Sequence, residues 1–147
     1  MKNKKFIGPV YKESEAFILA NFYEKSSQSI LYIGKDDIEI NSVENKLKWL
    51  LPNDLIFNFR SWDQIPYDLV SPSKEIQLGR IKTLYYLNLI KKKKIVLTTI
   101  NAVLQKTLYK DFILKNSFEI YENKKIKFKD LISKLLLLGY ERTSVVR

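Results

Sequence analysis

The chain has 147 residues and contains neither histidine nor cysteine. Without histidine it cannot form a Ser-His-Asp triad, a histidine general base or a histidine metal ligand. Without cysteine it has no thiolate nucleophile, no thiolate zinc site and no disulfide framework. Asp36-Asp37 is the only adjacent pair of carboxylates, and we predict that it starts a helix or faces solvent. We therefore expect a chain that is not an enzyme, with no catalytic, cofactor-binding or metal-binding residues and no cofactor.

Long apolar segments are also missing. No run approaches the roughly 18 apolar residues of a membrane span. Residues 1–9 are basic but lack the apolar core of a signal peptide. The chain is 46% hydrophobic and 29% charged, which is typical of a folded globular domain. We expect a cytoplasmic protein that makes no membrane contact.

Positive charge is abundant, but arginine is scarce. The formal net charge is +10, and only four of the 26 basic residues are arginine. Such a charge favours non-specific binding to DNA. The alternative is that the lysines are spread over solvated faces, since arginine is the residue best suited to bidentate phosphate and base contacts. A stand-alone basic nucleic-acid-binding domain is therefore an open second hypothesis.

Apolar segments alternate between strand-like and helix-like patterns along the chain. Strands that alternate with helices, and that are apolar on both faces, are typical of a parallel sheet covered on both sides. The sequence predicts an α/β fold for residues 1–116: three layers, with a mostly parallel sheet and helices on both faces. Strands are predicted at residues 30–33, 55–59, 95–99 and 118–121, and helices at residues 13–25, 42–51, 72–89, 101–108 and 128–138.

Four residues mark the ends of these predicted helices. Ser42 is a predicted N-cap, and Ser71-Pro72 reads as an N-cap followed by proline at the first helical position. Gly139 is predicted to end the helix at 128–138 as its C′ residue. That helix has a broad apolar face, yet little sequence follows it. We therefore expect residues 117–147 to be the incomplete beginning of a second domain.

The loop between the strand at 55–59 and the helix at 72–89 carries the most distinctive residues. Together with the block at residues 95–106 and the block that ends in Gly-Tyr-Glu-Arg, it resembles the N-terminal UvrB-like module of the bacterial transcription-repair coupling factor, Mfd. The blocks occur in the same order and at consistent spacing. The motif residues, structural or partner-facing, are Trp62, Pro66, Tyr67, Asp68, Ser71, Pro72, Arg80, Gly139, Tyr140 and Arg142.

This resemblance implies a degenerate P-loop (RecA-like) domain, similar to domain 1 of UvrB, followed by the start of a UvrB-type interaction domain that binds UvrA. The excision-repair helicase UvrB itself is the nearest alternative. Its P-loop needs glycines and a Gly-Lys-Ser/Thr sequence to bind phosphate. The equivalent segment here, residues 8–15, has one glycine and no such sequence. The short loop from Trp62 to Tyr67 also stands where UvrB has a tyrosine-rich hairpin.

The resemblance further implies a noncatalytic interaction and regulatory role in transcription-coupled nucleotide excision repair. The partners would be UvrA and the rest of the coupling factor, whose translocase motor lies far downstream. The arginines that contact UvrA in the family lie beyond Arg147, so Arg142 and Arg147 are the nearest candidates, or ordinary surface arginines.

Two readings of the loop residues stay open. Either Trp62, Pro66 and Tyr67 form a partner-binding surface, or the two aromatic rings pack over the end of the sheet and fix the loop, and we favour packing. Arg80 is predicted to pair with a carboxylate or to cap carbonyl groups rather than to contact DNA.

Overall fold

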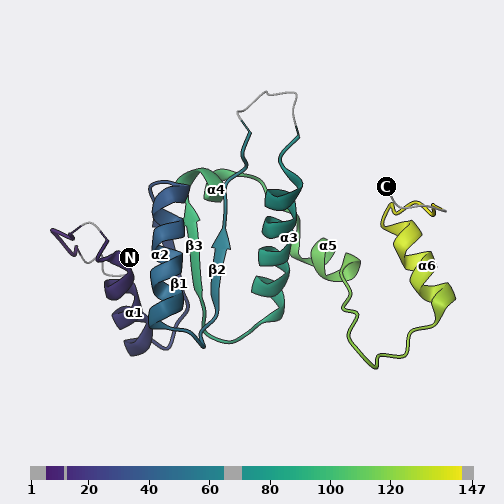
Figure 1. The fold of residues 1–147 in the computed structure, drawn as a ribbon, viewed down its shortest axis with the longest axis horizontal. Helices are drawn as coiled ribbons and strands as arrows, with labels where there is room; N and C mark the ends of the chain where they lie inside the picture. The colour runs from purple at the N-terminus through teal and green to yellow at the C-terminus, as the bar shows by residue number, and fades with distance from the viewer. Residues whose placement is uncertain (1–5, 12, 65–70, 144–147) are drawn as a thin grey trace. The chain divides into compact units, whose positions relative to one another are not determined.

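The computed structural model describes residues 6–11, 13–64 and 71–143 (Figure 1). The chain divides into two compact units, residues 1–108 and residues 109–147. This division lies earlier than the predicted domain boundary after residue 116, and the identity of the two predicted domains stays a prediction. The first unit contains α1 (Glu15–Lys25), β1 (Ile30–Gly34), α2 (Asp37–Leu50), β2 (Ile56–Phe59), α3 (Lys74–Leu89), β3 (Ile95–Thr99) and α4 (Ile100–Leu104), and the second contains α5 (Lys110–Asn116) and α6 (Phe128–Leu137).

The first unit is built on a three-stranded parallel sheet with the order β1-β3-β2. Ile95 of β3 is in register with Ile30 of β1 and with Ile56 of β2. Helices separate the strands along the chain, as a parallel sheet requires. The predicted α/β class and the three predicted strands of this sheet are confirmed.

The main core lies between α1, α2 and one face of the sheet. Since successive strand residues point to opposite faces, Phe57 lies on the other face, where Tyr86 of α3 stacks on it with ring centroids 6.3 Å apart. Leu31 and Ile33 of β1 remain 59% and 46% exposed on that second face. The second face is therefore covered near β2 and open near β1. The core residues are Ala16, Ala20, Tyr23, Ile40, Val43, Leu47, Leu51, Ile95 and Leu97.

Two helices begin elsewhere than predicted. α2 starts after Asp36, whose carboxylate accepts a hydrogen bond from the Glu39 N–H at 2.9 Å, so Ser42 lies inside the helix and is not its N-cap. α3 is capped by Ser73, which accepts from the Ile76 N–H at 3.4 Å, and not by Ser71. In both cases several polar residues near the helix start could serve as the cap. The prediction that the Asp36-Asp37 pair starts a helix is confirmed.

The chain after β3 differs most from the prediction. α4 ends at Leu104, and a second helix, α5, follows instead of one helix at residues 101–108. The strand predicted at residues 118–121 is wrong: these residues form no regular element, and Ile120 and Tyr121 are more than 60% exposed. Alternating polarity is not enough for a strand, because its backbone groups also need a neighbouring strand.

None of the helices in the described residues is long and apolar enough to cross a membrane.

Tyr23 links α1 to the loop before β3 and should make stability depend on pH. Its hydroxyl lies 3.2 Å from Asp54 Oδ1 and 3.1 Å from the Lys93 carbonyl oxygen, both acceptors. Burial, reinforced by Asp54, raises the pKa of Tyr23 to about 12 from its usual 10. The folded state therefore favours the neutral phenol. This preference stabilises the fold fully below pH 10, and the contribution is lost as the pH rises from 10 to 12. Urea unfolding at several pH values should therefore show a smaller loss of stability across this window in Tyr23→Phe than in the wild type. Equal losses would contradict this role.

Candidate functional site

The β2–α3 loop, residues 60–73, leaves the carboxyl end of β2 (Figure 1). This end of a parallel sheet is where α/β proteins commonly place their binding residues. Three of the predicted motif residues, Pro66, Tyr67 and Asp68, lie outside the described residues, so their predictions stay predictions.

Arg80 of α3 holds the base of this loop. It is only 3% exposed, and its guanidinium carbon lies 4.1 Å from the ring centroid of Phe59 and 4.2 Å from that of Trp62. The guanidinium also donates a hydrogen bond to the Arg60 carbonyl oxygen. Burial lowers the pKa of Arg80, because the charged form loses contact with water. The prediction that Arg80 caps a carbonyl is confirmed.

Further hydrogen bonds tie the loop to its surroundings. Ser61 Oγ donates to Asp37 Oδ2 of α2 at 2.8 Å, and the Trp62 N–H donates to Gln105 Oε1 at 3.2 Å. Trp62 itself is half-buried against Arg80. The tryptophan thus fixes the loop, which agrees with the favoured packing role.

Asp63 closes the loop on itself. Its carboxylate accepts from the Ser73 N–H at 3.1 and 3.3 Å, and hydrogen bonds from Ser73 hold the pKa of Asp63 below its usual value. The predicted site residues did not include Ser61, Asp63, Ser73 or Gln105. Asp63 follows the motif residue Trp62, but nothing in the sequence shows that the chain returns to it ten residues later.

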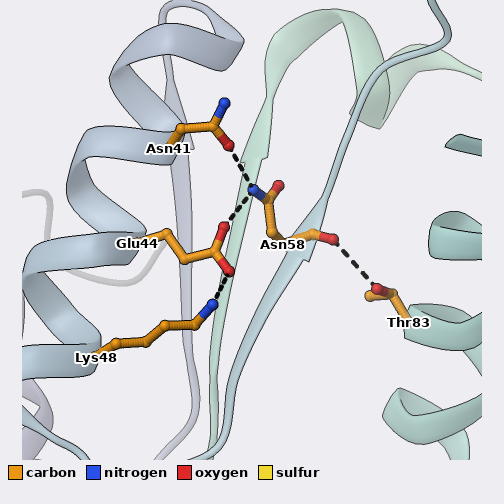
Figure 2. A network of polar contacts seen from close by, with 5 residues as sticks. All are labelled: Asn41, Glu44, Lys48, Asn58 and Thr83. Atoms are coloured by element: carbon orange, nitrogen blue, oxygen red, sulfur yellow. Dashed lines mark hydrogen bonds and ion pairs between the residues drawn. The ribbon is translucent and has the colours of Figure 1, made fainter. Parts of the chain in front are cut away.

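A polar network centred on Asn58 joins β2 to α2 and to α3 (Figure 2). The Asn58 side-chain amide donates to Asn41 Oδ1 at 3.2 Å and to Glu44 Oε2 at 2.6 Å. Glu44 also pairs with Lys48 at 2.6 Å. The Asn58 carbonyl oxygen points the opposite way, towards α3, and accepts from Thr83 Oγ1 at 3.2 Å. Asn58 therefore connects both flanking helices to the outer strand of the sheet.

A groove of about 380 Å³ runs between β2 and α3. We call it the β2 groove. Both charged and apolar residues line it, among them Ile56, Phe57 and Asn58 of the strand. Its lining includes Asn58, Arg60, Ile76, Gly79, Lys82 and Tyr86.

Gly79 is an unusual residue for the middle of α3. A Cβ at this position would meet no atom within 4 Å, and glycine inside a helix costs about 0.5–1 kcal/mol relative to alanine. Gly79→Ala should therefore raise the free energy of unfolding, measured with urea, by about that amount. Gly34→Ala is the matched control and should destabilise, since its Cβ would lie 2.8 Å from Ile40 Cδ1 in the core. A loss of stability in Gly79→Ala would contradict the open geometry.

A second pocket, of about 410 Å³, lies at the N-terminus of α1 and the start of α2. Four carboxylates line it, from Glu13, Glu15, Asp36 and Glu39, and one lysine, Lys35. Glu15 is the first residue of α1, and Glu13 lies two residues before it, so the start of this helix carries negative charge. In the described part of the chain, no group of three or more His, Cys, Asp or Glu residues could hold a metal ion.

The second unit presents an apolar helix face. None of the residues of α6 is buried. The helix ends as predicted at Gly139, which has φ 86° and donates to the Leu136 carbonyl oxygen at 3.0 Å, while the Tyr140 N–H donates to that of Leu135 at 3.1 Å. This pair of bonds is the Schellman arrangement.

A hollow of about 280 Å³ lies on that face. We call it the α6 hollow. Arg142 lines it and is exposed, whereas Arg147 lies outside the described residues. The lining residues are Phe128, Ile132, Leu135, Leu136, Tyr140, Glu141 and Arg142.

Comparison with known proteins finds no matching family model, but it finds similar curated proteins. The chain is 31% identical over 128 residues to the transcription-repair-coupling factor of Rickettsia bellii, a match that covers 87% of this chain and 11% of that protein. It is 30% identical over 131 residues to the factor of the same name from Borreliella burgdorferi, covering 88% and 11%. The factor from Escherichia coli is 19% identical over 143 residues, covering 97% and 12%. The chain therefore spans only about a ninth of the length of these relatives.

Proposed function

Because this chain is homologous to a region of the transcription-repair coupling factor, Mfd, over most of its length, we propose that it is a noncatalytic interaction module that acts in DNA repair. The observation that carries this proposal is the similarity across 87% of the chain to 11% of a much longer protein. The missing histidine and cysteine support a role without chemistry of its own.

The acidic pocket at α1 supports the loss of a nucleotide site. In a P-loop, glycine N–H groups and a lysine neutralise the phosphates at a helix N-terminus. Here Glu13 and Glu15 flank the start of α1, and Asp36 and Glu39 line the same pocket. Four carboxylates would repel a triphosphate. The proposal thus includes a degenerate P-loop domain similar to domain 1 of UvrB.

Nucleotide binding is the direct test of this part. Equilibrium dialysis of the 147-residue chain against ATP and Mg²⁺ should give no saturable binding, and no phosphate should be released. Saturable ATP binding would contradict the proposal, since it would require a phosphate site that the acidic pocket opposes.

We propose that the module works by binding a protein partner, with UvrA as the first candidate, through the α6 hollow. The resemblance to the coupling factor suggests UvrA, and the unburied apolar face of α6 with Arg142 beside it supports the location. Apolar patches with an arginine nearby are favoured at protein interfaces. In a longer coupling factor the same module would also contact the remaining domains and help to keep the resting protein inactive.

A DNA-binding domain is the second candidate, and the net charge of +10 is the observation that favours it. A protein that binds DNA through phosphate contacts loses affinity steeply as salt rises. Fluorescence anisotropy with labelled duplex DNA at increasing salt separates the two functions. Tight binding that collapses with salt, without binding to UvrA, would favour the DNA-binding domain.

A further inference from the structure

The outer edge of β2 has no strand beside it in the described residues, because the order β1-β3-β2 leaves this edge free. The Ile95 N–H of β3 donates to the Leu55 carbonyl oxygen at 2.9 Å. Leu55, Phe57 and Phe59 therefore direct their backbone groups towards β3. It follows that Ile56 and Asn58 direct their N–H and C=O groups outwards, into the β2 groove.

α3 provides hydrogen-bond partners for only some of the outward backbone groups at this edge. Thr83 donates to the Asn58 carbonyl oxygen (Figure 2). Arg80 donates to the Arg60 carbonyl oxygen. No described residue accepts a hydrogen bond from the outward N–H groups of Ile56 and Asn58. These two N–H groups, two residues apart on β2, can therefore donate hydrogen bonds to a molecule bound in the groove.

Gly79 has no side chain and so leaves open space on the α3 side of the groove. It lies between Ile76 and Thr83, which line the same groove one turn before and one turn after it. No contact inside the chain requires glycine here, because a Cβ would meet open space. Glycine commonly occurs where another backbone approaches closely.

We propose that the β2 groove binds an extended acidic peptide segment of a partner protein, which pairs with the outer edge of β2 and passes over Gly79. An extended backbone carries free carbonyl groups at the spacing of the outward N–H groups, whereas a helix uses its own carbonyls internally. Two carboxylates line the groove, but Glu44 pairs with Lys48 and Glu75 with Arg60. Lys82 also lines it and makes no ion pair among the described residues, and the chain is strongly basic. Both favour acidic residues in the peptide. This inference does not depend on UvrA or on the α6 hollow.

Random peptides displayed on phage, selected on the 147-residue chain, provide the probe. Enriched peptides should be acidic, and their synthetic forms should slow hydrogen exchange at the Ile56 and Asn58 amides. Gly79→Leu should weaken their binding at least about tenfold, because the leucine side chain would occupy the space over which the peptide backbone passes. Leu78→Ala is the control, because Leu78 is 67% exposed and lies outside the groove lining.

Three results would overturn the proposal: no enriched peptide, peptides that bind Gly79→Leu as well as the wild type, or protection of Ile56 and Asn58 only through self-association of the chain. If Gly79→Leu does not fold by circular dichroism, Lys82→Glu replaces it. That variant should also weaken the acidic peptides at least about tenfold, and unchanged binding would again overturn the proposal.

Discussion

Arg80→Leu is expected to lower the free energy of unfolding by about 2–4 kcal/mol. A desolvated guanidinium above an aromatic ring is worth up to about 2 kcal/mol, and Arg80 lies close to two rings, those of Phe59 and Trp62. The substitution also removes the donor to the Arg60 carbonyl oxygen, and an unpaired buried polar group costs about 1–3 kcal/mol. The recovered cost of burying the charge and the apolar contacts of leucine offset part of this loss.

Arg60→Leu is the matched control for this substitution. The Arg60 side chain is 44% exposed and lies 3.8 Å from Glu75, and exposed ion pairs contribute at most about 1 kcal/mol. Arg80→Lys should lie between the two, because lysine keeps the charge but not the planar group that stacks. Urea unfolding measures all three variants. If Arg80→Leu were no less stable than Arg60→Leu, the anchoring role of Arg80 would be wrong.

Leu135→Asp is expected to lower the affinity for UvrA at least about tenfold, the effect of removing one central interface residue. Leu135 lines the α6 hollow and is half-buried there. A carboxylate at this position would have to lose its water on binding. Arg142→Glu should act in the same direction by reversing the charge beside the hollow.

The same substitution elsewhere on the helix is the control. Leu137→Asp lies on α6 but outside the lining of the hollow, and Leu137 is 87% exposed. It should leave the affinity, measured by surface plasmon resonance, nearly unchanged. Equal losses in both leucine variants would show that α6 responds to any new charge and that the hollow is not the contact.

The sequence alone predicted the three strands of the sheet and the broad class, because each of these strands is a short apolar run between clear turns. Helix starts were less certain, since Asp36 and Ser42, or Ser71 and Ser73, are equally good caps until the tertiary structure selects one. The strand at 118–121 failed because a strand requires a partner that the sequence of the segment itself does not reveal.

The contacts at the candidate sites likewise depend on partners that the local sequence does not reveal. Arg80 stood out as a motif residue, and either a carboxylate or a carbonyl was predicted as its partner. Its position between Phe59 and Trp62 could not be predicted, because these residues lie about 20 positions away and meet Arg80 only once α3 has packed beside β2. The β2 groove depends on the strand order, which local sequence patterns do not determine.

If this chain is a noncatalytic module that binds a repair protein, purified UvrA should bind the folded 147-residue chain saturably in isothermal titration calorimetry without added nucleotide. Leu135→Asp should weaken this binding, and Leu137→Asp should not. A folded chain that gives no saturable heat of binding with UvrA would mean that the proposed function is wrong.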